Sequence, residues 1–79
     1  MDKNKKSVLI GTLDYMQRID PNGTWEDVAE DIAHGEIVEK HDITYTIETL
    51  KDWAGELEDG DRMKKTMEQW IERLKIINE

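Results

Sequence analysis

The chain contains no cysteine. This absence excludes a disulfide framework and a thiolate metal site, and it removes the commonest covalent support of small secreted domains. Long apolar runs are absent as well. The basic start is followed by only three apolar residues, Val8 to Ile10, which is too short for the hydrophobic part of a signal peptide, and no other stretch could span a bilayer. We therefore expect a cytoplasmic protein that does not bind membranes.

Positive charge is scarce in the middle of the chain. The segment from Asp20 to Asp61 holds 14 carboxylates and only two cations, Lys40 and Lys51, for a net charge of −12. Each flank carries +2, and the whole chain carries −8 at pH 7. Such a charge repels nucleic acid and anionic membranes, and it attracts basic proteins over a Debye length of about 8 Å at physiological salt.

The residue sets that serve catalysis are also missing. No Ser-His-Asp or Cys-His set can be assembled, and the five glycines are scattered singly, so no glycine-rich phosphate loop exists. The carboxylates are too many and too irregularly spaced to nominate an acid and nucleophile pair. We expect a protein that is not an enzyme and carries no cofactor.

Only two residues, His34 and His41, could supply a nitrogen ligand or a general base near neutral pH. Their separation of seven residues matches no zinc signature, and Glu30 with His34 is simply a pair one helical turn apart. The acidic residues around Gly60 lack the ligand spacing and the closing glutamate of an EF-hand. We predict no metal site.

Hydrophobic spacing predicts helices at both ends of the 79-residue chain. A first helix over 7–19 places Leu9, Leu13 and Met16 on one face, and Asp20-Pro21 ends it because the residue before proline avoids the α region. A last helix begins after Asp61, its predicted N-cap. In that helix Met63, Met67, Trp70, Leu74 and Ile77 repeat a heptad spacing and Ile71 widens the stripe.

The second helix has the clearest amphipathic pattern. From Trp25 to Ala33 the apolar residues occupy positions i, i+3, i+4, i+7 and i+8. Thr24 is the predicted N-cap, with Asp27 three residues later as a variant of the capping box. His34 and Gly35 form a predicted C-terminal signal.

The stretch 36–47 permits two interpretations. Ile43, Tyr45 and Ile47 alternate with threonines, a pattern typical of a strand, so a short β-hairpin within 36–47 is one of them. The other is a helix that starts near Thr44 or Thr46 and continues the apolar rhythm through Leu57, and we favour it. We thus predict a single small acidic domain over 1–79 with an all-α fold, a bundle of three or four short helices.

The acidic surface is the candidate functional feature. The pairs Glu26 with Glu30 and Asp27 with Asp31 place like charges one turn apart, at a cost of a few tenths of a kcal/mol each. An alternative is that these are solvated acids near a helix N-terminus, where they favour the macrodipole. We predict that the partner-binding residues are Glu26, Asp27, Glu30, Asp31, Glu36, Glu39, Asp52 and Glu56.

Three tryptophans, Trp25, Trp53 and Trp70, fall on apolar stripes and are predicted core residues. The alternative is that one of them anchors a partner, because tryptophan is enriched at binding hot spots and a chain this small cannot bury three completely.

These features favour a non-enzymatic protein–protein interaction module, an inhibitor or regulator that docks on a basic surface such as that of a nuclease or another nucleic-acid-binding protein. In composition the chain resembles the small acidic inhibitors encoded by phages and other mobile elements, including anti-CRISPR and anti-restriction proteins, some of which act as DNA mimics. This likeness involves no alignable motif and transfers no residue.

Two alternatives stay open. One is a homo-oligomeric adaptor or regulatory subunit, such as a homodimer, in which the heptad stripe or the opposite charges of flanks and centre pair protomers. The other is a helix-turn-helix DNA-binding regulator built from 25–33 and 46–57. Its recognition helix would bring Glu48, Asp52 and Glu56 to the phosphates with a single lysine, so we do not expect direct nucleic acid binding.

Overall fold

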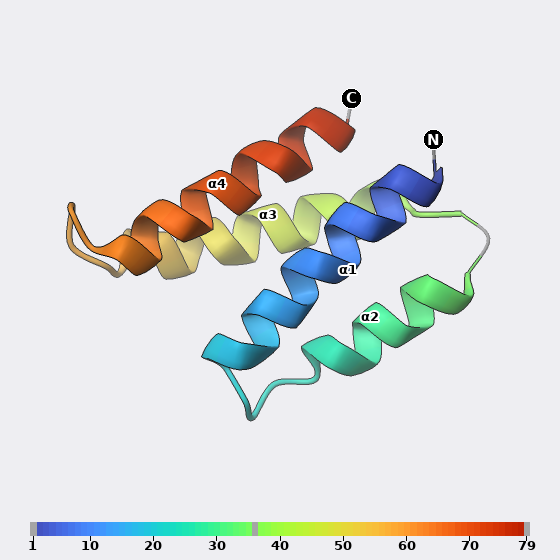
Figure 1. Cartoon of the computed structure of the whole chain (residues 1–79), viewed down its shortest axis with the longest axis horizontal. Coiled ribbons are helices and arrows are strands. Elements are labelled where there is room, and N and C mark those ends of the chain that lie inside the picture. The colour runs from blue at the N-terminus through green and yellow to red at the C-terminus, as the bar shows by residue number, and fades with distance from the viewer. Residues whose placement is uncertain (1, 36, 79) are drawn as a thin grey trace. The chain divides into compact units, whose positions relative to one another are not determined.

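The computed structural model describes residues 2–35 and 37–78, and these residues form helices without any strand. The helices are α1 (Asp2–Ile19), α2 (Trp25–His34), α3 (Lys40–Gly55) and α4 (Arg62–Ile77), as Figure 1 shows. The predicted all-α fold of three or four short helices is confirmed. In the part of the chain so described, no helix has both the length and the apolar character needed to cross a membrane.

The chain divides into two compact units, Met1–Glu39 and Lys40–Glu79. In the first, α1 contacts α2, and in the second, α3 contacts α4. Each unit is an antiparallel pair of helices joined by a short loop (Figure 1). A short connection brings consecutive helices back alongside each other, so pairing of sequence neighbours is the expected local solution.

Helix α1 begins at Asp2, five residues before the predicted start at Ser7. Lysine is a good helix former, and nothing in the basic segment breaks the helix. Lys6 also donates a hydrogen bond from Nζ to the carbonyl oxygen of Gly35, just past the end of α2. This contact between residues 29 apart could not be predicted from local sequence, and it places a cation at a helix C-terminus, where the macrodipole favours positive charge.

The predicted apolar face of α1 is buried. Leu9, Leu13 and Met16 are at most 1% exposed, and Thr12 lies among them. The Thr12 hydroxyl donates to the Val8 carbonyl at 2.8 Å, which satisfies its polar group inside the apolar stripe.

The loop from α1 to α2 is held by side chains on both sides of it. Gln17 accepts a hydrogen bond on Oε1 from the Glu26 backbone N–H at 2.9 Å and donates from Nε2 to the Pro21 carbonyl at 3.1 Å. Trp25 donates from its indole nitrogen to Asp20 at 3.2 Å. Gly23 fits beneath this ring, because a Cβ there would lie 2.4 Å from the indole nitrogen.

The predicted N-cap position of α2 is confirmed, but the capping hydrogen bond expected from Thr24 is absent. Gln17 of the preceding helix caps α2 instead, since it accepts from one of the backbone N–H groups that a helix start leaves unpaired. The C-terminal signal is placed correctly, as α2 ends at His34, although Gly35 is extended rather than left-handed.

Helix α3 decides between the two interpretations of 36–47, and the β-hairpin is wrong for the described residues of that stretch. The helix starts at Lys40, earlier than the predicted Thr44 or Thr46, and runs to Gly55. Its buried side chains, Ile43, Thr46, Ile47, Leu50 and Ala54, follow the helical rhythm. The Thr46 hydroxyl donates to the Asp42 carbonyl at 2.8 Å, so a β-branched polar residue is accommodated within the helix.

The turn between α3 and α4 starts earlier than predicted, because α3 ends at Gly55 and not at Leu57. Gly60 has φ +91°, in the left-handed region that favours glycine. Asp61 caps α4 as predicted, since its Oδ1 accepts from the Met63 N–H at 2.8 Å. The buried side chains of α4 are Met67, Ile71, Leu74 and Ile77, whereas Met63 is exposed.

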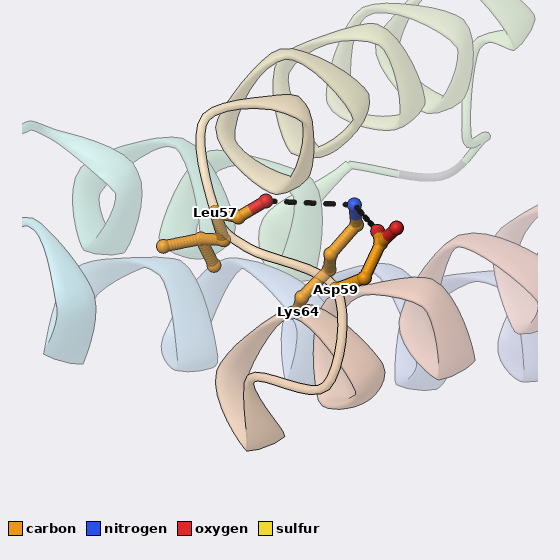
Figure 2. A network of polar contacts seen from close by, with 3 residues as sticks. All are labelled: Leu57, Asp59 and Lys64. Carbon is orange, nitrogen blue, oxygen red and sulfur yellow. Dashed lines mark hydrogen bonds and ion pairs between the residues drawn. The ribbon is translucent and has the colours of Figure 1, made fainter.

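Lys64 ties this turn to the first part of α4. Its Nζ donates to Asp59 at 2.7 Å and, more weakly, to the Leu57 carbonyl at 3.5 Å (Figure 2). The hydrogen bond and charge of Lys64 lower the pKa of the Asp59 carboxyl below its usual value. The same hydrogen bond to Asp59 raises the pKa of Lys64.

Candidate functional site

Four carboxylates form the outward surface of α2. Glu26 and Glu30 lie one turn apart, and Asp27 and Asp31 lie one turn apart beside them. All four are exposed, whereas Ala29 on the opposite side is 4% exposed. We call Glu26, Asp27, Glu30 and Asp31 the α2 acidic face.

The charges of the α2 acidic face are not neutralised within the described part of the chain. The ion pairs described there join Asp59 with Lys64 and Glu72 with Lys75, and the Asp42 carboxylate lies beside the His41 imidazole. None of them includes a carboxylate of the α2 acidic face, and Glu26 takes part in the loop only through its backbone N–H. The first two of these acids sit in the first turn, where the helix macrodipole favours negative charge. Glu30 and Asp31 lie further along the helix, where that effect has fallen off.

An exposed apolar side chain adjoins this face. Val28 is 39% exposed although it belongs to the predicted apolar stripe of α2, and Ala33 is exposed too. Trp25 and Ile32 are half-buried. The surface of α2 therefore combines carboxylates with a small apolar margin.

The remaining predicted binding residues lie elsewhere. Glu39 is exposed immediately before α3, Asp52 is exposed near the end of α3, and Glu56 is exposed just after it. Asp52 and Glu56 belong to the second unit, whereas the α2 acidic face belongs to the first. Glu36 lies outside the described residues.

The two histidines belong to different units, His34 to the first and His41 to the second. His34 is exposed at the end of α2. His41 lies 3.2 Å from the Asp42 carboxylate, and with Glu39 these two offer ligand atoms within 4.8 Å of one another. Exposed acidic groups gather in this way in many proteins that bind no ion, and nothing else at this point indicates a cation, so we assign no metal site here.

The three tryptophans are all half-buried. The Arg73 guanidinium lies 4.7 Å from the centroid of the Trp70 ring, in the range of a cation–π contact. The aromatic side chain that stands out is instead Tyr45, which is 61% exposed. In the sequence, the alternation of Tyr45 with threonines is also compatible with a strand. Because 40–55 is a helix, Tyr45, two residues from each of the buried residues Ile43 and Ile47, faces away from them.

No protein-family model matches the chain, and no curated protein and no solved structure is significantly similar to it. The chemistry of the α2 acidic face therefore has to be interpreted from the residues of this chain.

Proposed function

We propose that the chain is a non-enzymatic interaction module whose α2 acidic face docks on a basic surface of another protein. One observation carries the proposal: four exposed carboxylates lie together on one helix and none is paired with a cation among the described residues. Two pairs of like charges one turn apart destabilise a helix slightly. A cationic partner would relieve this repulsion, because it would be attracted to both carboxylates of each pair.

Nucleases and other nucleic-acid-binding proteins are the partners that fit best. Their binding clefts are built to neutralise phosphates, and a row of carboxylates presents the same sign of charge. Complementary charge also accelerates association, so an inhibitor of this kind would bind quickly and in a salt-dependent way. The small acidic inhibitors of phages and mobile elements, some of them DNA mimics, are the class that this proposal indicates, and the lack of cysteine is compatible with action in the cytoplasm.

The test compares two variants of equal net charge. One neutralises the α2 acidic face through Glu26→Gln, Asp27→Asn, Glu30→Gln and Asp31→Asn. The other neutralises four exposed carboxylates outside it, through Asp14→Asn, Glu58→Gln, Glu68→Gln and Glu72→Gln. The immobilised wild type and both variants are incubated with cell lysate at about 50 mM and about 500 mM NaCl, and bound proteins are quantified by mass spectrometry.

We expect a basic nucleic-acid-binding protein to be retained at low salt by the wild type and by the second variant, and to be lost from the first. Equal losses in both variants would show that net charge alone attracts the protein. That result would contradict a specific role for α2.

A further inference from the structure

A second surface of the chain combines an exposed aromatic ring with carboxylates. On α3, Tyr45 is 61% exposed, with His41 one turn before it and Glu48 one turn after it. Asp52 continues the row by a further turn. The spacing from His41 is +4, +7 and +11, so these side chains share one face of the helix. All four are exposed, and we call them the α3 stripe.

The surface around Tyr45 is shallowly concave. Lys40, His41, Thr44, Tyr45 and Glu48 line it. The phenol ring and the methyl and methylene groups of its neighbours give it an apolar floor, while Glu48 stands at one edge and Lys40 at the other. A rise of about 1.5 Å per residue separates the backbone positions of Lys40 and Glu48 by about 12 Å along the helix, so the two ends of the surface differ in the sign of their charge.

Folding of α3 does not require this face. Ile43, Ile47, Leu50 and Ala54 supply the buried side of the helix. Tyr45 has β propensity and modest helix propensity, so neither packing nor local preference accounts for it here. A single exposed apolar residue is ordinary. An exposed tyrosine followed one and two turns later by carboxylates that form no ion pair among the described residues is a more specific arrangement.

The chemistry of the α3 stripe suits a guanidinium group. Arginine is planar, is more weakly hydrated than lysine, stacks on aromatic faces and can donate two parallel hydrogen bonds to one carboxylate. Lysine offers a compact, strongly hydrated charge that gains less from either feature. Because Lys40 would repel a cation at the start of α3, a bound guanidinium would approach from the side of Glu48 and Asp52.

We propose that the α3 stripe binds an arginine of a basic protein segment, with the guanidinium stacked on Tyr45 and paired with Glu48, and with Asp52 available to a second cation. This inference rests on the proposed function in that the partner is basic, but it concerns a different helix and a preference for arginine over lysine. If charge complementarity alone determined binding, arginine and lysine would bind equally well.

The experiment is an NMR titration of the ¹⁵N-labelled full chain with two amidated peptides of the same length and charge, one alternating glycine with arginine and the other alternating glycine with lysine. A cation–π contact on an exposed ring corresponds to about a two- to fivefold gain in affinity, and arginine makes such contacts more often than lysine because its guanidinium stacks and is weakly hydrated. We therefore expect the arginine peptide to bind about threefold more tightly, with shifts centred on Tyr45, Glu48 and Asp52. Tyr45→Leu should abolish this ratio, and Glu48→Gln should weaken binding of both peptides.

Controls separate this inference from the proposed function. Glu68→Gln removes one exposed carboxylate of α4 and should leave both affinities unchanged, and the variant that neutralises the α2 acidic face should keep the arginine preference. Equal binding of the two peptides, or a preference that survives Tyr45→Leu, would overturn the inference. Shifts confined to α2 would also overturn it while leaving the proposed function intact. Retention of lysate proteins by the α2 variant would contradict the proposed function alone.

Discussion

Gly23 is the residue whose size matters most in the α1–α2 loop. A Cβ at this position would lie 2.4 Å from the Trp25 indole nitrogen and 2.8 Å from the Asp20 carboxylate, two groups that are hydrogen-bonded to each other. At least one of these side chains would have to shift to make room for a Cβ. The absence of a side chain at Gly23 is therefore part of how the loop packs.

We predict that Gly23→Ala destabilises the protein by about 1–3 kcal/mol, the usual cost of overpacking. Gly55→Ala is the matched control, because a Cβ at this last residue of α3 meets nothing within 4 Å. Alanine in a helix is favoured over glycine by up to about 1 kcal/mol, so the control should be neutral or stabilising. Urea denaturation followed by circular dichroism measures both, and equal effects of the two substitutions would contradict the packing argument.

The Asp59–Lys64 pair predicts a pH dependence of stability at both the acid and the alkaline end of the pH range. Lys64 lowers the pKa of Asp59 below 3.8, so its stabilisation is present above that unfolded value and is lost as pH falls through the lower, folded-state pKa. The raised pKa of Lys64 affects stability at alkaline pH. Its contribution is present below 10.5 and is lost as pH rises through the higher, folded-state pKa.

Asp59→Asn should therefore lower the Tm slightly at pH 7, because exposed ion pairs contribute little. The difference from the wild type should vanish once the pH lies well below 3.8. Thermal melts from pH 2 to pH 7 test this, with Glu58→Gln as a neighbouring substitution that removes a charge outside the pair. A difference that persists at pH 2 would show that Asp59 acts through something other than its charge.

At the scale of the helices, α2 and α4 begin in different ways. The start of α4 is capped locally by Asp61, whereas the start of α2 is capped by Gln17 from the preceding helix. A local cap such as Asp61 can be predicted from a short sequence motif. The cap supplied by Gln17 depends on how α1 and α2 pack against each other, so no local sequence pattern predicts it.

Asp61→Ala should cost about 0.5–2 kcal/mol, the range measured for N-cap side chains. Thr24→Ala should cost only a few tenths of a kcal/mol, because the Thr24 hydroxyl makes no capping hydrogen bond. Chemical denaturation of the two variants side by side provides the comparison. A Thr24 substitution as costly as that of Asp61 would show that α2 is capped by Thr24 after all.

Removal of like charges from α2 is expected to stabilise the protein, whereas the N-cap substitutions described above are expected to destabilise it. Glu30→Gln with Asp31→Asn relieves both repulsive pairs and keeps the first-turn acids, Glu26 and Asp27, that favour the macrodipole. At about 0.2–0.5 kcal/mol per pair, the double variant should gain about 0.4–1 kcal/mol at low salt. The control, Glu68→Gln with Glu72→Gln, removes acids near Lys64 and Lys75 and should lose stability slightly. If the α2 double variant is no more stable than the wild type, repulsion between these carboxylates does not destabilise the helix.

For the whole molecule, the net charge of −8 predicts that salt stabilises the fold. Repulsion among unpaired exposed carboxylates weakens as the Debye length falls from about 30 Å at 0.01 M salt to about 3 Å at 1 M. We expect the Tm to rise over this range, and to rise less in the variant that neutralises the α2 acidic face. Differential scanning calorimetry at several NaCl concentrations measures this, and a Tm that falls with salt would show that attractive ion pairs dominate instead.

Much of the fold could be predicted from local physical chemistry. Asp20-Pro21 ends α1, Asp61 caps α4, and the apolar spacing identifies the buried residues Leu13, Leu50 and Leu74. These features act over one or two turns of chain, so a sequence reports them directly. The candidate binding residues were likewise expected from charge alone, and the described ones are exposed.

What only the tertiary structure decided involves residues that are distant in sequence or ambiguous in pattern. The alternation around Tyr45 fits a strand as well as a helix, and the packing of Ile43 and Ile47 as part of the α3 core selects the helix. Gln17 replaces Thr24 as the cap of α2, and Lys6 extends to the far end of that helix. The physical reason is common to these cases: local propensities differ by less than about 1 kcal/mol, so contacts made across the fold determine the outcome.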